Sequence, residues 1–94
     1  MTWINYGYVV ASTYRVKVLR ALSSHPKTPK QVSKEVNIGL THVSRTLKEL
    51  AEKELIYCVN PDEVKGRVYR LTEEGRRVAE IIEKDKQKDS VASR

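Results

Sequence analysis

Residues 28–53 constrain the fold more than any other segment, because they fit two short helices joined by a tight turn. The segment Thr28–Gln31 supplies a capping threonine, a proline at the first helical position and a glutamine at the third, which together form a capping box. We therefore expect a helix over about 29–36, with its buried side formed by Val32 and Val36. Asn37 suits the left-handed position after a helix, and Ile38 is expected to anchor the turn in the core.

A second helix is expected over about 40–53, and its two faces differ in chemistry. On a helical wheel the aliphatic side contains Leu40, Val43, Leu47 and Leu50. The remaining surface carries hydrogen-bond donors and cations: Thr41, His42, Ser44, Arg45 and Lys48. Acids enter only near the C-terminal end of this helix, so its N-terminal part suits an approach to phosphates and base edges.

The segment before this pair predicts one more helix. Apolar residues recur at helical spacing from residue 11 onward, at Ala11, Tyr14, Val18 and Leu22. Ser12 is either the cap of this helix or the join between two helical pieces, and His25-Pro26 ends it. Residues 1–11 are apolar and aromatic, and their pattern leaves a helical turn and a strand equally open.

The second half of the chain predicts a hairpin and a last helix. Two segments rich in β-branched and aromatic residues, 55–59 and 67–71, flank a polar linker with strong turn residues. Thr72 then caps a helix whose first turn is acidic and whose apolar stripe contains Leu71, Val78, Ile81 and Ile82. Residues 1–82 are expected to form one domain, and 83–94 a polar, frayed tail.

The charge is distributed unevenly along the chain. Residues 1–48 carry eight Lys/Arg and one acid, a balance of +7, whereas residues 49–94 carry ten Lys/Arg and eleven acids, a balance of −1. A basic half beside a neutral one indicates a face that binds a polyanion.

Several classes of protein are excluded by what the sequence lacks. It has no apolar run long enough for a membrane span and no signal-peptide core, so we expect a cytoplasmic, nucleoid-associated protein. The single Cys58 cannot form an internal disulfide and is expected to fill space in the core. His25 and His42 lack the clustered partners of a metal site. Neither a phosphate-cradling loop nor an activated nucleophile is recognisable, so we expect no cofactor and no enzyme activity.

The predicted order of elements resembles the winged helix-turn-helix proteins. The segments TPKQVSKEVNIGLTHVSRTLKELAEKELIY and GRVYRLTEEGRRV are similar to small archaeal and bacterial regulators of the ArsR/MarR-like type. These commonly join the last strand to the last helix through Y-x-L-T-x-x-G, which is Tyr69–Gly75 here. The resemblance covers about residues 10–78. It implies an α+β fold with a three-helix core, a C-terminal two-stranded β-hairpin wing and a fourth, C-terminal helix.

Two positions depart from that family pattern. Gly39 stands where a serine usually caps the recognition helix, at an expected cost of a few tenths of a kcal/mol. Glu54 stands where a glycine usually precedes the first strand of the wing. A left-handed backbone at Glu54 would cost about 1–2 kcal/mol, unless the helix runs on and the turn shifts.

The resemblance implies a sequence-selective transcriptional regulator that binds double-stranded DNA. The recognition helix (about 40–53) would enter the major groove with Arg45 as the best candidate for a guanine contact, while a basic wing (65–67) grips the minor groove or backbone. The expected DNA-binding residues are Thr28, Lys30, Gln31, Thr41, His42, Ser44, Arg45, Lys48, Lys65 and Arg67. Winged helices also serve as architectural DNA binders with little selectivity and as protein-interaction modules, and both remain alternatives.

Assembly as a homodimer follows from the same resemblance, because two recognition helices must span half-sites one helical turn apart. Two surfaces are candidates for the interface. One is the aromatic N-terminal segment, and the other is the last helix through Ile81 and Ile82. The N-terminal segment could equally cover its own core.

Overall fold

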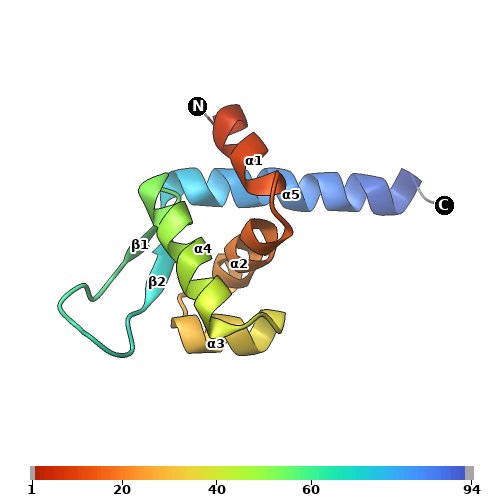
Figure 1. Ribbon diagram of the computed structural model, residues 1–94. Helices are drawn as coiled ribbons and strands as arrows, with labels where there is room; N and C mark the ends of the chain where they lie inside the picture. The colour runs from red at the N-terminus through yellow and green to blue at the C-terminus, as the bar shows by residue number, and fades with distance from the viewer. Residues whose placement is uncertain (1, 93–94) are drawn as a thin grey trace.

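The computed structural model describes the backbone of residues 2–92 and the side chains of residues 2–85. Its helices and strands follow in the order α1 (Thr2–Val10), α2 (Thr13–Ser24), α3 (Pro29–Val36), α4 (Leu40–Glu52), β1 (Ile56–Cys58), β2 (Tyr69–Leu71) and α5 (Glu73–Ala92). Figure 1 shows α5 lying across one end of the molecule, α3 at the opposite end, and the β1–β2 hairpin to one side. The expected winged-helix architecture is confirmed, with one helix added at the N-terminus.

The N-terminal segment is a helix rather than a strand, and α1 packs against α5. The carboxylate of Glu74 at the start of α5 accepts hydrogen bonds from Thr2 at 3.0 Å and from Asn5 at 2.8 Å. The bond from Asn5, assisted by that from Thr2 and by the charge of Arg77, lowers the pKa of Glu74 against the opposing effect of burial. These polar contacts attach the helical N-terminal segment to the last helix.

Helix α2 begins one residue after Ser12, whose hydroxyl accepts from the backbone N–H of Arg15. The apolar stripe predicted for this helix is partly wrong. Val18 and Leu22 are buried, but Ala11 precedes the helix and is exposed, and Tyr14 is also exposed. The core is instead completed by Leu19 and Ala21, because the face of α2 that meets its neighbours is rotated away from Tyr14.

The predicted capping box of α3 is present in both directions. The N–H of Gln31 donates to the Thr28 hydroxyl at 3.2 Å, and the Gln31 side chain accepts from the N–H of Thr28 at 2.8 Å. Asn37 adopts the expected left-handed conformation, with φ 57° and ψ 47°, and Ile38 is buried. Local chemistry therefore sets both ends of α3 and the direction in which the chain enters α4.

Helix α4 buries Val43, Leu47 and Leu50 as predicted, together with Thr46. Leu40 departs from the prediction, because at the first turn of the helix it lies beyond the core and is 44% exposed. Glu54 after the helix has φ 58°, so the left-handed turn is retained without the usual glycine.

The hairpin is shorter than the sequence suggested. Strands β1 and β2 pair antiparallel over three residues each, with Tyr57 opposite Arg70. Residue Lys27 adds two backbone hydrogen bonds to Tyr69, which tie the start of α3 to the second strand of the wing. The loop between the strands, residues 59–68, is called the wing loop below.

Helix α5 begins at the predicted cap, because the Thr72 hydroxyl accepts from the N–H of Gly75 at 3.0 Å. Val78, Ala79 and Ile82 enter the core, whereas Ile81 is only half-buried. The helix continues through residue 83, the expected domain boundary, to Ala92. The end of the expected tail, 93–94, lies outside the described residues. Within residues 2–92, no helix has the length and apolar character that crossing a membrane requires.

Candidate nucleic-acid interface

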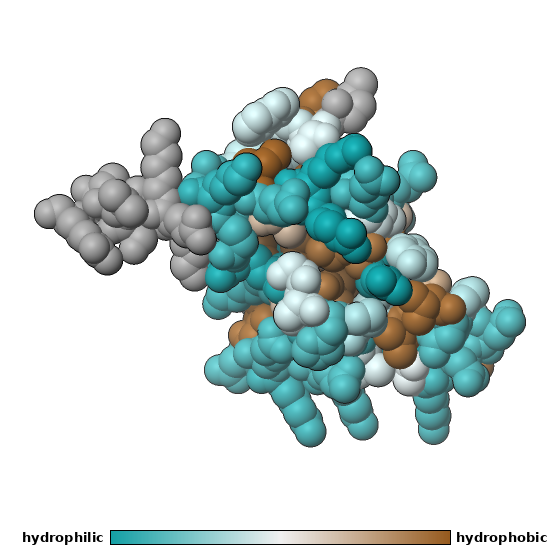
Figure 2. Space-filling model, turned by 180° about the vertical axis from the view of Figure 1, so that it is seen from behind, coloured by the Kyte–Doolittle hydropathy of each residue, from teal (hydrophilic) through white to brown (hydrophobic). Residues whose placement is uncertain are grey.

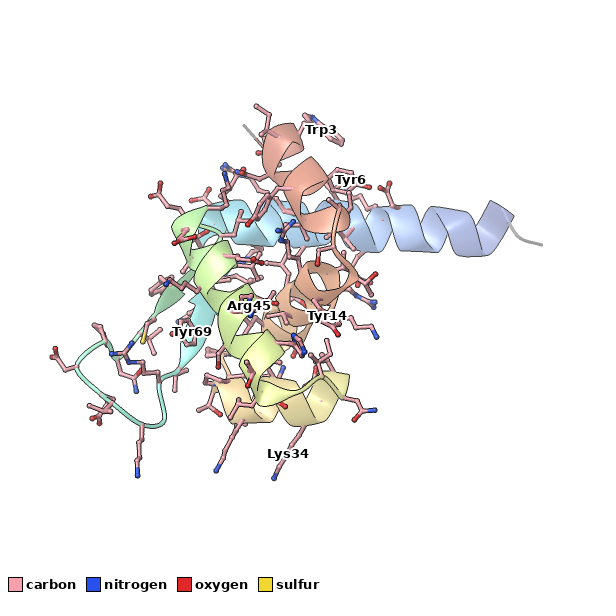
Figure 3. All side chains as sticks on the ribbon, in the orientation of Figure 1. Trp3, Tyr6, Tyr14, Lys34, Arg45 and Tyr69 are labelled. Carbon is pink, nitrogen blue, oxygen red and sulfur yellow. The ribbon has the colours of Figure 1, made fainter. Side chains whose placement is uncertain are left out.

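The exposed side of α4 carries all five residues that the sequence assigned to a recognition surface. Thr41, His42, Ser44, Arg45 and Lys48 are each exposed, whereas the opposite side of the helix is buried. In Figure 3, Arg45 lies on α4 and Lys34 extends from the end of the molecule that α3 forms. Because the core fixes the rotation of α4, these polar side chains form one continuous outward face.

The two cations on this face are available to an external anion. Arg45 and Lys48 make neither an ion pair nor a side-chain hydrogen bond within the described part of the chain. An unpaired guanidinium keeps both edges of its planar fork for a phosphate or for the two acceptors of a guanine edge.

His42 has a neighbour that the sequence prediction missed. The ring of Tyr14, on α2, lies 5.3 Å from the His42 ring between centroids. Tyr14 was predicted to point into the core, but it is 42% exposed and lies beside the polar face of α4. No sequence pattern marks this role, because it depends on how α2 and α4 cross.

The start of α3 contributes one free cation and two occupied polar groups. The Thr28 hydroxyl and the Gln31 amide are engaged in the capping box, whereas Lys30 is exposed and makes no side-chain contact among the residues described. The first backbone N–H groups of a helix can receive a phosphate, and Lys30 adds a positive charge beside them.

The wing loop presents two cations in different ways. Lys65 is exposed and has no partner in residues 2–85. Arg67 is also exposed, but its Nε donates to the carbonyl of Glu63 at 2.7 Å and its Nη2 to the carbonyl of Pro61 at 3.5 Å. Figure 2 shows apolar surface on the wing side of the molecule. Within the wing loop, Val59 is 44% and Val64 is 89% exposed.

A groove of about 560 Å³ separates the wing loop from the first turns of α3 and α4. Cations line it from both sides, with Lys30 on the α3 side and Lys65 and Arg67 on the wing side. Exposed apolar side chains complete the lining, among them Leu40 and Val64. Three separate segments of the chain therefore meet at one concave, basic surface.

Ion pairs within the protein reduce the number of cations that are free to bind an external anion. Arg15 pairs with Glu49 at 3.3 Å, Arg20 with Glu83 at 2.6 Å, and buried Lys27 with Glu35 at 3.2 Å. The Lys27 ammonium also donates to the carbonyl of Ala21 and to the hydroxyl of Ser24, and so completes the end of α2. Three of the eight cations in residues 1–48 are thus engaged in ion pairs within the protein.

The described residues contain no cluster of His, Cys, Asp and Glu side chains that could hold a metal ion. Cys58 is only half-buried, rather than a core residue, and its thiol lies 3.5 Å from the Asn60 side-chain oxygen at the base of the wing.

These elements define a winged-helix protein, and comparisons with known proteins agree. The profile of the HVO_A0261 N-terminal domain family matches residues 4–92, so the chain belongs to that family. None of the curated proteins matches the chain.

Solved structures with this fold share little sequence with the chain. The C30AH42A mutant of ZitR from Lactococcus lactis superposes with a TM-score of 0.79 at 22% identity, over 87% of this chain and 57% of that one. The transcriptional regulator SlyA gives 0.79 at 20% identity, over 96% and 65%. NMB1585, a MarR family regulator from Neisseria meningitidis, gives 0.77 at 24%, over 94% and 62%. The chain therefore spans less than two thirds of each, and the likeness establishes the fold; SlyA and NMB1585 are described as regulators, not as enzymes.

Proposed function

We propose that this protein is a transcriptional regulator that binds double-stranded DNA through α4 in the major groove. The observation that carries the proposal is the outward face of α4, where Arg45 and Lys48 are exposed and unpaired on a helix held rigidly by its buried side. The regulators among the matching structures support the same function.

The geometry suggests a division of roles among these residues. Arg45 reads a guanine, and Thr41, His42, Ser44 and Lys48 contact neighbouring base edges or phosphates. One sugar–phosphate strand lies in the groove between α3 and the wing loop, where it meets Lys30 and Lys65. Of the backbone N–H groups of residues 28–31, the capping box and the proline leave only that of Lys30 free, and it faces the same strand.

The test is a fluorescence-anisotropy titration of a random-sequence duplex from about 50 to about 300 mM salt, followed by sequence selection. We expect affinity to fall with salt at a log–log slope of about −0.9 per neutralised phosphate. Absence of binding at the lowest salt would refute the proposal and favour a protein partner.

Selectivity is tested with three variants on the selected duplex and on an unrelated one. Arg45→Ala should cost about 1–3 kcal/mol on the selected duplex only, whereas Lys30→Ala should weaken both duplexes alike. Lys84→Ala, an equal charge change on an exposed position of α5, is the control and should change neither. If Arg45→Ala weakens both duplexes equally, the protein is an architectural DNA binder.

We also propose that the protein acts as a homodimer through the outward face of α1. Trp3 is 71%, Ile4 69% and Val10 43% exposed, although the helix is anchored to α5 on its other side. An apolar helix face of this kind is best covered by a second copy, because a two-fold dimer also presents two recognition helices to successive major grooves.

The dimer is tested by the mass of the protein in analytical ultracentrifugation. Trp3→Glu should shift the population toward monomer, whereas Val64→Glu, at an even more exposed apolar position on the wing loop, should not. An unchanged dimer mass in Trp3→Glu would refute the α1 interface.

A further inference from the structure

The wing loop is held in shape by its own side chains. The Asn60 amide donates to the carbonyl of Gly66 at 3.2 Å, and the oxygen of the same side chain accepts from the N–H of Val68 at 2.7 Å. One side chain therefore joins the two ends of the loop, and Gly66 supplies the left-handed turn, with φ 69°, that lets them meet.

Arg67 braces the part of the loop that Asn60 does not reach. Its Nε–H and one Nη2–H point to the carbonyls of Glu63 and Pro61, so the planar guanidinium spans the turn from inside. These two groups form the side edge of the fork, one of the two edges with which an arginine holds a phosphate or a guanine. In Arg67 that edge is occupied by backbone.

Lys65 lies two residues before Arg67 and makes no such contact with the carbonyls of the loop. Its ammonium has no partner among the described side chains or backbone groups, and it lines the same groove as Lys30. The loop therefore contains one cation directed to its own carbonyls and one that is available to a ligand.

We propose that Arg67 is a positioning residue, whose guanidinium holds the wing loop so that Lys65 meets a DNA phosphate. This rests on the DNA binding proposed above and reassigns Arg67, which the sequence placed among the contacts. A loop that is already ordered before DNA binds loses less conformational entropy on binding, and this smaller loss raises the affinity. If the loss of the Arg67 contacts leaves one more residue of the loop mobile in the free protein, ordering that residue when DNA binds lowers the affinity about tenfold.

The experiment measures duplex affinity across a salt series for the wild type, Arg67→Lys, Arg67→Gln and Lys65→Gln. Lysine preserves the charge of Arg67 but, as a single ammonium, cannot bridge two carbonyls. We expect both Arg67 variants to lose about tenfold in affinity with the wild-type salt slope. Lys65→Gln should instead reduce the magnitude of the slope by about 0.9, the value for one phosphate.

Wild-type affinity in Arg67→Lys would overturn the proposal, as would a reduced salt slope in Arg67→Gln, because both are the behaviour of a phosphate contact. ¹⁵N relaxation without DNA provides a second, independent readout. Order parameters at Val64, Lys65 and Gly66 should fall below about 0.6 in both Arg67 variants while those of α4 stay near 0.85. Unchanged order parameters in the loop would refute the positioning role of Arg67, whether or not the wild type binds DNA. Failure of the wild type to bind DNA would separately refute the proposed function.

Discussion

Replacing Gly75 by alanine is expected to destabilise this protein, although alanine is the better helix former by about 1 kcal/mol. Gly75 lies in the first turn of α5, where the helix passes directly over the backbone of Leu55. A Cβ at this position would lie 1.9 Å from the Leu55 carbonyl oxygen and 2.9 Å from its carbonyl carbon. Both atoms belong to the backbone, so no side-chain rotation can relieve the contact.

The size of the effect follows from what must move. The Leu55 oxygen accepts from the N–H of Thr72 at 3.0 Å, and separating the two segments would stretch or break that bond. Overpacking costs about 1–3 kcal/mol and a lost hydrogen bond about 0.5–1.5 kcal/mol, against the gain in helix propensity of about 1 kcal/mol. The net loss is about 0.5–3.5 kcal/mol, and a central value of about 2 kcal/mol corresponds to a fall in Tm of roughly 8–16 °C for a domain of this size.

Thermal unfolding followed by circular dichroism measures this loss, and Gly7→Ala is the matched control. Gly7 is also helical, but a Cβ there has nothing within 4 Å, so the substitution should raise Tm by a few degrees. Both variants are compared over a dilution series, which separates folding from any self-association. If Gly75→Ala raises Tm as Gly7→Ala does, the close approach of α5 to Leu55 is not a feature of the folded protein.

Three further substitutions test other parts of the fold. Glu54→Gly should raise the free energy of unfolding in urea by up to about 1 kcal/mol, because glycine removes the strain of a left-handed backbone at this position. Asn37→Gly, the control, should change the free energy of unfolding little, and equal gains in the two variants would contradict this reasoning. Glu74→Gln tests the lowered pKa of this carboxyl group. The carboxylate's contribution to the free energy of unfolding is present above its ordinary pKa of 4.5 and is lost as pH falls through the folded pKa. The wild type and the variant should therefore differ in stability at neutral pH and converge in acid. A constant difference across that range would mean that no such shift exists. Thr28→Ala should lower stability by about 1 kcal/mol through loss of the capping box with Gln31, and an unchanged Tm would show that the cap contributes nothing.

Prediction from sequence worked best where the structure depends on nearby residues. The capping box at Thr28, the left-handed Asn37 and the cap at Thr72 were all predicted, because each involves hydrogen bonds within a few residues. The strand ends were less accurate, since the hairpin's pairing stops where the wing loop closes through Asn60 and Arg67. Loop closure through backbone carbonyls leaves no pattern in the sequence.

The amino-acid sequence by itself determined the order of the elements from α2 onward, the winged-helix architecture and the polar outward face of α4, but it left residues 1–11 open between a helical turn and a strand. Only the tertiary structure decided that Tyr14 lies beside His42, that Arg67 bonds to its own loop, and that Gly75 must lack a side chain to pass Leu55. Helical periodicity and capping act over a few residues and can be read along the chain. The placement of Tyr14 and the passage of α5 over Leu55 arise where segments distant in sequence cross, and the angle of a crossing is set by the packing of the whole core.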